Sequence, residues 1–304
     1  MLPVLPHAVV IRDVGPRDGL QPEAPQSIGD RVRLIEALVA AGVRRIEAVA
    51  FVSPRAVPAM ASAAEVLTAV PRLEGLRYTA LVPNVRGAEL ALTCDVDELS
   101  VTISLSETYN QRNVHMSTAD STAEIAEICS MAGRIPVDAV LSCAFGSPYE
   151  GEVLPAAVAD LAHRLRDAGC VSVTCADTTG MATPRRIGDV VDAVGLDIGL
   201  HLHETRGTAL VCAYAGLALG VTRFDTSVGG LGGSPFAAGS AGNLATEGLV
   251  AMLDDLEVHT GIDVEGVVTA AHLARDLVGR DLPSPVAHSG PRTRLADASP
   301  GEER

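Results

Sequence analysis

Short strand-like runs alternate with longer helical patterns along most of this 304-residue chain, and this alternation limits its possible folds more than any other feature. Runs rich in β-branched residues predict strands, and the stretches between them carry apolar residues at helical spacing. We expect eight strands, at residues 8–14, 45–51, 78–82, 98–104, 137–144, 171–176, 198–203 and 223–228. Eight strand–helix units predict a parallel sheet that closes into a (β/α)8 barrel, the TIM-barrel fold.

The first predicted helix, residues 30–41, illustrates the helical pattern. Its apolar residues at helical spacing are Val32, Leu34, Ile35, Leu38 and Val39. Gly42 stands where a glycine would end the helix. Two further helices are expected after the eighth strand, at 243–260 and 264–278, so the barrel domain is assigned to residues 1–280. Residues 281–304 are rich in Pro, Ser, Gly and charge, and we expect a flexible tail there.

Composition excludes several functions. The formal net charge of −15 would repel nucleic acid and anionic lipid, and no apolar run is long enough to span a bilayer. Neither nucleic acid nor a membrane is therefore an expected partner. The six cysteines lack CxxC spacing, which favours a reduced, cytoplasmic compartment. All 23 basic residues are arginines, so Schiff-base catalysis by lysine is excluded, and an enolate would need a metal, a guanidinium or hydrogen bonds.

Polar residues gather at the predicted carboxyl ends of the strands, where barrel enzymes carry their reactive groups. His201 and His203 lie two apart on a predicted strand, so both side chains should point to one face and could bind one metal ion. Two histidines bonded to backbone groups would explain the pair equally well. Asp18 and Asn243 would add oxygen ligands, although a turn residue and a helix N-cap are the alternatives. This mixed nitrogen and oxygen set favours magnesium or manganese over structural zinc.

Three further residues are candidates for chemistry. Arg17 offers fixed donors to a developing enolate oxygen, although a surface ion pair is the alternative. Asp177 is a candidate proton carrier or an ordinary turn residue. Glu47 could hold Arg17 or a metal ligand from behind. The other polar candidates near the strand ends are Gln21, Ser106, Glu204, Arg206 and Glu247.

A glycine-rich loop follows the eighth strand. It covers residues 229–242 and includes Gly230, Gly232 and Gly233. Glycines give hinge freedom, so we expect a mobile lid. The alternative, a loop that cradles phosphate, lacks the GxxxxGK[ST] motif.

Six sequence blocks resemble hydroxymethylglutaryl-CoA lyase and its relatives among the metal-dependent lyase and condensing-enzyme barrels. The blocks are DVGPRDGLQ at 13–21, IEAVAFVSPRAVPAM at 46–60, SLSETYNQRN at 104–113, DTTG at 177–180, HLHETRG at 201–207 and SVGGLGGSPFAAGSAGNLATE at 227–247. The resemblance implies a divalent metal bound by Asp18, His201, His203 and Asn243. It implies a catalytic set of Arg17, Asp177, His201 and Ser234, with Glu47 structural. It also implies cleavage of an acyl-CoA substrate to acetyl-CoA and a keto acid.

Two departures from the lyase pattern bear on activity. Ser234 stands in GGSPFA where lyases have the cysteine of GGCPYA, and a serine hydroxyl is a much weaker acid than a thiol. Arg206 stands where lyases commonly have tyrosine, so a second arginine is expected at the mouth of the site. Two other functions remain open: an enzyme that condenses acetyl-CoA with a 2-oxo acid, and a non-catalytic homologue that binds metal and acyl-CoA. A homo-oligomer is expected.

Overall fold

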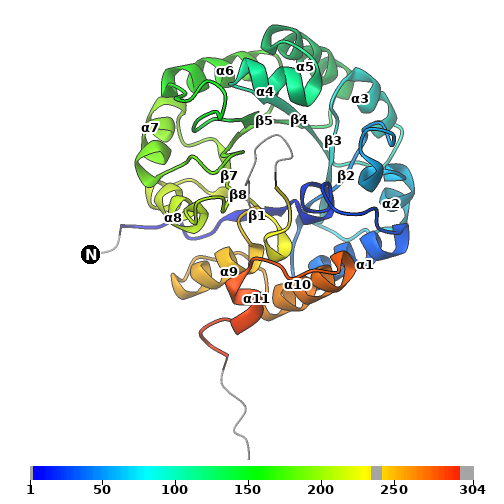
Figure 1. The fold of residues 1–304 in the computed structure, drawn as a ribbon, viewed down its shortest axis with the longest axis vertical. Coiled ribbons are helices and arrows are strands. Elements are labelled where there is room, and N and C mark those ends of the chain that lie inside the picture. Colours follow the sequence, from blue (N-terminus) through cyan, green and yellow to red (C-terminus); the bar gives the residue numbers. More distant parts are fainter. Residues whose placement is uncertain (1–2, 234–241, 295–304) are drawn as a thin grey trace, which may run out of the picture.

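Eight parallel strands, hydrogen-bonded in sequence order, form a barrel that closes where β8 pairs with β1 (Figure 1). The computed structural model describes residues 3–233 and 242–294. The strands are β1 (Val10–Asp13), β2 (Arg45–Ala50), β3 (Arg77–Leu81), β4 (Glu98–Ser104), β5 (Val137–Ser142), β6 (Ser172–Ala176), β7 (Gly199–His201) and β8 (Arg223–Thr226). The predicted barrel is therefore confirmed.

Several strands are shorter than the sequence pattern predicts. Strand β5 ends at Ser142 because Cys143 adopts a left-handed backbone conformation, with φ of 58°. Strand β7 ends at His201, and His203 instead forms an isolated bridge with Asn243. The prediction that both histidines lie on one strand was wrong in this respect.

Helices surround the barrel on the outside (Figure 1). They are α1 (Ile28–Ala40), α2 (Ala63–Ala69), α3 (Val85–Ala91), α4 (Glu107–Val114), α5 (Thr118–Ala132), α6 (Pro155–Asp167), α7 (Pro184–Val194), α8 (Ala209–Leu219) and α9 (Thr246–Asp255). Helix α1 begins after Ser27, whose hydroxyl oxygen accepts from the Asp30 amide at 3.1 Å. It ends just before Gly42, whose φ of 97° suits a helix terminus.

Two further helices follow α9, and the first of them lies beside α1 (Figure 1). They are α10 (Val264–Val278), as predicted, and α11 (Pro285–Ser289). Helix α11 packs on α9 and α10, with Leu282 and Ala287 buried. The segment predicted as a flexible tail thus includes a short packed helix, and residues 295–304 lie outside the described part of the chain.

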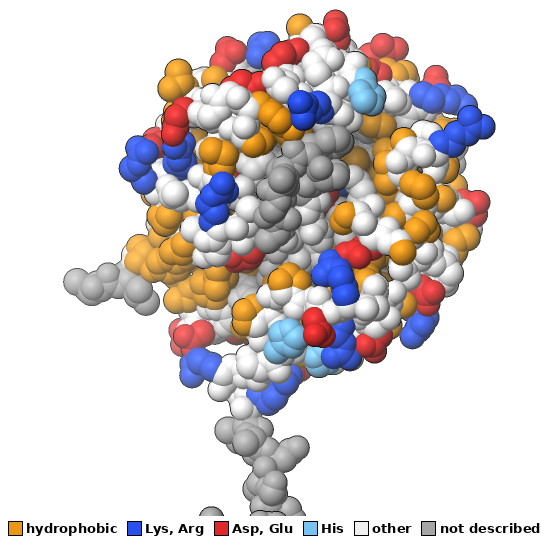
Figure 2. All heavy atoms as spheres, viewed as in Figure 1, with side chains coloured by type: hydrophobic (Ala, Val, Ile, Leu, Met, Phe, Trp, Pro, Cys, Tyr) orange, Lys and Arg blue, Asp and Glu red, His pale blue; other side chains and the backbone are white. Residues whose placement is uncertain are grey.

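The outer surface is of mixed character. Figure 2 shows acidic and basic side chains interspersed around the rim of one face, with hydrophobic side chains between them. Within residues 3–233 and 242–294, no helix combines the length and apolar character needed to cross a membrane.

Asp13, at the end of β1, ties the barrel to the start of α9. Its Oδ1 accepts from the Gly15 amide at 2.8 Å, and its Oδ2 accepts from the Thr246 hydroxyl at 2.6 Å. The side chain is fully buried, and this burial raises the pKa of Asp13 to about 7. The carboxyl is therefore more easily ionised in the unfolded chain than in the folded one.

We predict that Asp13 makes the protein less stable as pH rises. The folded state holds a proton that the unfolded state loses above its lower pKa, so the free energy of unfolding should fall between about pH 4 and 7. Asp13→Asn should reduce this fall by roughly 2–4 kcal/mol, measured by urea unfolding at several pH values. The exposed Asp192→Asn is the control. Equal pH slopes for the wild type and Asp13→Asn would contradict the prediction.

Candidate active site

A cavity of about 170 Å³ lies at the carboxyl ends of the strands. Its polar lining includes Arg17, Asp18, Gln21, Glu47, Thr102, Ser142, Thr178, His201, His203 and Asp225. Its apolar lining includes Val52, Val57, Leu81, Pro83 and Val140. The cavity occupies the place where (β/α)8 enzymes carry their reactive groups.

A single turn after β1, η1 (Gly15–Gly19), places Arg17 and Asp18 in this cavity. The Val14 carbonyl oxygen accepts from three consecutive amides, those of Arg17 at 3.1 Å, Asp18 at 2.7 Å and Gly19 at 3.1 Å. One carbonyl thus fixes the whole turn. Because three amides donate to one carbonyl, the backbone of the turn is fixed. The side chains of Arg17 and Asp18 therefore leave the backbone in fixed directions.

Arg17 is held by two carboxylates. Its Nε donates to Glu47 Oε2 at 2.6 Å, and its Nη1 donates to Asp18 Oδ1 at 2.7 Å. Burial acts to lower the pKa of Arg17, but Glu47 and Asp18 outweigh it, and the pKa lies above its ordinary value. The guanidinium is therefore a permanent cation, and buried Glu47 fixes its orientation through Nε and Nη2.

Asp18, His201 and His203 bring one ligand atom each to within 4.8 Å of one another. The two Nε2 atoms lie 3.2 Å apart, and His201 Nε2 lies 4.0 Å from Asp18 Oδ2. Burial acts to raise the pKa of Asp18, but Arg17 and the histidines lower it overall, so the carboxylate is ionised. Although β7 ends at His201, both imidazoles still meet, as metal binding requires.

Asn243 adds an oxygen to this group. Its Nδ2 donates to Asp18 Oδ2 at 2.8 Å and to the Leu231 carbonyl at 2.9 Å, while its buried Oδ1 has no hydrogen-bond partner among the described residues. Helix α9 is capped by Ala245, so Asn243 is not its N-cap. A buried amide that bonds Asp18 and has an unpaired oxygen fits a divalent cation, which would satisfy that oxygen.

Asp177 follows β6 between two residues that line the cavity, Ala176 and Thr178, but it is not itself part of the cavity wall. Its Oδ1 accepts from the amides of Met181 at 2.6 Å and Ala182 at 3.0 Å, whereas its buried Oδ2 has no hydrogen-bond partner within residues 3–233 and 242–294. Burial raises the pKa of Asp177 to about 6. One oxygen thus shapes the turn, and the other is available to a proton near neutral pH. The two roles that the sequence left open are compatible.

Gln21 lines the cavity, but three other polar candidates do not belong to its wall. The hydroxyl of Ser106 caps α4 by accepting from the Tyr109 amide at 3.0 Å. Glu204 Oε1 accepts from the Leu210 amide at 3.3 Å. Arg206 Nη1 donates to the carbonyls of Thr179 and Gly180 at 2.8 and 2.9 Å. The expectation that Arg206 enters the mouth was therefore wrong, because it fastens the loop after β6.

Glu247 and the glycines form the base of the loop after β8. Glu247 is fully buried, and its Oε2 accepts from the Gly229 amide at 3.1 Å. Gly230, Gly232 and Gly233 all have positive φ, and Gly233 lines the cavity. Ser234 lies outside the described residues, as does the rest of 234–241, so the lid stays a prediction.

Asp225 and Tyr109 also line the cavity, and neither was predicted from the sequence. Asp225 Oδ2 lies 3.2 Å from His201 Nδ1. Burial acts to raise the pKa of Asp225, but Arg12 and His201 hold it well below its ordinary range. A charged residue inside a buried strand was the available signal, since such a charge needs a partner. Tyr109 gave no comparable signal.

The fold and these side chains define a class of protein: a (β/α)8-barrel enzyme with a candidate divalent-metal site beside a fixed arginine. The model of the HMGL-like family matches residues 8–274. The chain belongs to the HMGL-like family.

Similar proteins carry lyase names. The 3-hydroxy-3-isohexenylglutaryl-CoA/hydroxymethylglutaryl-CoA lyase of Pseudomonas aeruginosa is 39% identical over 91% of this chain and 95% of its own. Human mitochondrial hydroxymethylglutaryl-CoA lyase is 38% identical over 94% of this chain and 90% of its own. A solved structure of an Acinetobacter baumannii HMG-CoA lyase, in complex with coenzyme A and 3-methylmalate, is 36% identical, with a TM-score of 0.90. The match covers 95% of this chain and 97% of that one.

We predict that Gly232→Ala weakens metal binding. A β-carbon at Gly232 would lie 2.4 Å from Asn243 Nδ2, so the amide must move away from Asp18. The Mn²⁺ dissociation constant should rise roughly tenfold, as when a partner of a metal ligand is lost. Gly195→Ala is the matched control, because Gly195 has φ of 94° with open space around it. Equal Mn²⁺ affinity in both variants would count against this placement of Asn243.

Proposed function

We propose that this chain is a metal-dependent carbon–carbon lyase. Its substrate is a 3-hydroxy-3-substituted dicarboxylyl-CoA, such as hydroxymethylglutaryl-CoA, and its products are acetyl-CoA and a keto acid. The observation that carries the proposal is the convergence of Asp18, His201 and His203 beside Arg17 in one cavity. The names of the relatives from Pseudomonas aeruginosa and human support the same chemistry.

The metal ligands in this proposal are Asp18, His201, His203 and Asn243. When bound, a divalent ion would polarise the substrate hydroxyl and carboxylate and make the hydroxyl more acidic. Magnesium or manganese suits this donor set, which has two oxygens, two imidazoles and no thiolate. The proposal is supported by the grouping of the Asp18, His201 and His203 ligand atoms. It is also supported by the hydrogen bond from Asn243 to Asp18.

The reaction needs a base for the hydroxyl proton and a cation for the enolate. Once the hydroxyl is deprotonated, the adjacent carbon–carbon bond breaks, its electron pair forms the thioester enolate, and the hydroxyl carbon becomes a ketone. We assign proton acceptance to Asp177, since its pKa near 6 leaves it ionised yet basic at neutral pH. Arg17 stabilises the enolate oxygen through its fixed donors. Return of the hydroxyl proton to the enolate carbon yields acetyl-CoA and restores the base.

The apolar part of the cavity suits the substituent of the substrate. Val52 and Val57 follow β2, Leu81 ends β3 and Pro83 follows it, across the mouth from β7. An alkyl group placed there loses contact with water without burying a polar group. We therefore propose that the substrate carries an alkyl substituent of methyl size or larger.

Two further features belong to the proposal. Its setting is the cytoplasm, supported by six cysteines that are free thiols. Its active form is a homo-oligomer, supported by α8, which contains no charged residue yet leaves Val211 and Leu219 exposed.

The test is a coupled assay for acetyl-CoA release. Hydroxymethylglutaryl-CoA and its 3-isohexenyl analogue are each tested with Mg²⁺ or Mn²⁺, and then with a chelator. We expect release that the chelator abolishes. The Ser234→Cys variant should release acetyl-CoA faster if the weak acidity of serine limits proton transfer. No metal-dependent release of acetyl-CoA from either thioester, by the wild type or by the variant, would overturn the proposed function.

A further inference from the structure

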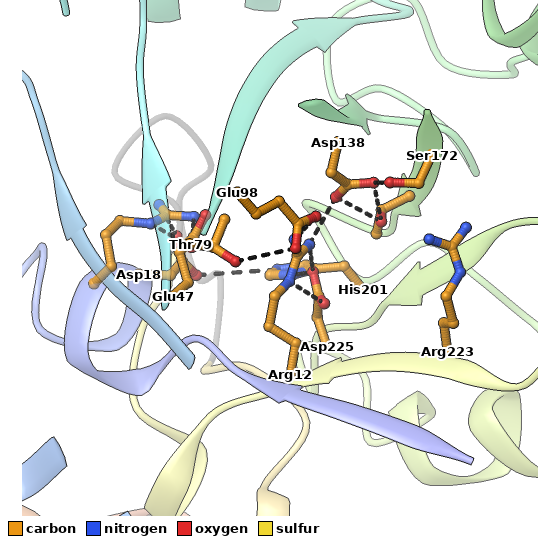
Figure 3. A network of polar contacts seen from close by, with 12 residues as sticks. Arg12, Asp18, Glu47, Thr79, Glu98, Asp138, Ser172, His201, Arg223 and Asp225 are labelled. Atoms are coloured by element: carbon orange, nitrogen blue, oxygen red, sulfur yellow. Dashed lines mark hydrogen bonds and ion pairs between the residues drawn. The ribbon is translucent and has the colours of Figure 1, made fainter. Parts of the chain in front are cut away.

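A row of three buried side chains crosses the inside of the barrel and ends at a proposed metal ligand (Figure 3). Arg12 on β1 is the register partner of Asp225 on β8, and Asp225 is the register partner of His201 on β7. Register partners on neighbouring parallel strands point to the same side of the sheet. Barrel closure therefore places these residues side by side.

The contacts along this row fix the Asp225 carboxylate. Arg12 donates from Nε to Oδ1 and from Nη2 to Oδ2, both at 2.8 Å. Two parallel hydrogen bonds from a planar guanidinium hold a carboxylate in one plane. In that plane, Asp225 Oδ2 lies 3.2 Å from His201 Nδ1.

This arrangement determines which nitrogen of His201 is available to a metal. When Nδ1 carries the proton and donates it to Asp225, Nε2 keeps its lone pair. Nε2 is the atom that faces His203 Nε2 and Asp18. A carboxylate behind a metal-binding histidine fixes both its tautomer and its ring orientation.

Arg12 is itself anchored on its far side. Its Nη2 also donates to Asp138 Oδ2 at 2.9 Å, and Asp138 accepts from Ser172 Oγ at 2.6 Å and Thr174 Oγ1 at 3.0 Å. Arg12 and both aspartates are buried. The guanidinium thus cannot swing away from Asp225 without breaking a second buried ion pair.

Arg12 also lies between two cavities. A cavity of about 260 Å³ opens at the amino ends of the strands, and Arg12, Asp138 and Asp225 line it. Asp225 lines the catalytic cavity as well. Without Arg12, no other residue of this row would hold the Asp225 carboxylate toward His201 rather than toward the cavity at the amino ends of the strands.

We propose that Arg12 is a positioning residue for the metal site, acting through Asp225 on His201. The inference rests on the proposed function, because it takes His201 to be a metal ligand. Its role is geometric: Arg12 holds the carboxylate that orients the imidazole, and it contacts neither substrate nor metal. Lysine at this position would keep the charge but not the paired hydrogen bonds.

The test measures Mn²⁺ binding by electron paramagnetic resonance in the wild type, Arg12→Gln and Arg12→Lys. We expect the dissociation constant to rise roughly 10- to 100-fold in Arg12→Gln, the usual effect of losing a partner behind a ligand, and less in Arg12→Lys. Asp138→Asn should weaken binding moderately, since it loosens Arg12 alone. Arg223→Gln is the matched control. Arg223 lines the cavity at the amino ends of the strands but does not belong to the row of Arg12, Asp225 and His201.

A second readout separates positioning from stability. In ¹⁵N-histidine spectra of the metal-free protein, we expect one tautomer of His201 in the wild type and a mixture of tautomers in Arg12→Lys. Arg12→Lys keeps the buried positive charge, so it remains a test if Arg12→Gln fails to fold. If folded Arg12→Lys shows wild-type Mn²⁺ affinity and a single His201 tautomer, the inference is overturned but the proposed function stands. Absence of Mn²⁺ binding by the wild type would overturn the proposed function and the inference with it.

Discussion

Pairing of β8 with β1 is the interaction on which the site depends. Asp18 follows β1, whereas His201 ends β7 and Asn243 follows β8, so the ligands come from opposite ends of the barrel sequence. The Val14 amide donates to the Thr226 carbonyl at 2.7 Å just where the turn of Arg17 begins. The same strand pairing that closes the barrel therefore brings the proposed ligands together. A shift in the register of β1 would separate them.

Two buried arginines inside this barrel are each held between two acidic side chains. Arg17 lies between Glu47 and Asp18, and Arg12 lies between Asp225 and Asp138. Each group would be costly if one partner were missing, because an unpaired buried charge destabilises a protein by roughly 3–5 kcal/mol. The same groups fix the directions of side chains. The polar interior thus gives the mouth of the barrel rigid donors and ligands at some cost in stability.

The barrel could be predicted from the sequence because a short run of β-branched residues followed by a helical period marks each unit. Arg17, Asp18 and His201 could be placed in the cavity because they follow strand ends. Contacts between strands could not be predicted in the same way, since they depend on register, and the Arg12–Asp225 pair was missed. Arg206 was misplaced because the direction of a loop side chain depends on the carbonyls that fold against it.

The central claim is that one divalent ion is bound by two imidazoles and two oxygens at the mouth of the barrel. The most direct test is a Mn²⁺ titration of His203→Ala beside the wild type, with bound and free ion counted. The account predicts one site in the wild type and loss of most binding in the variant, because the variant lacks one of only two nitrogen ligands. Equal affinity and stoichiometry in the two proteins would contradict it.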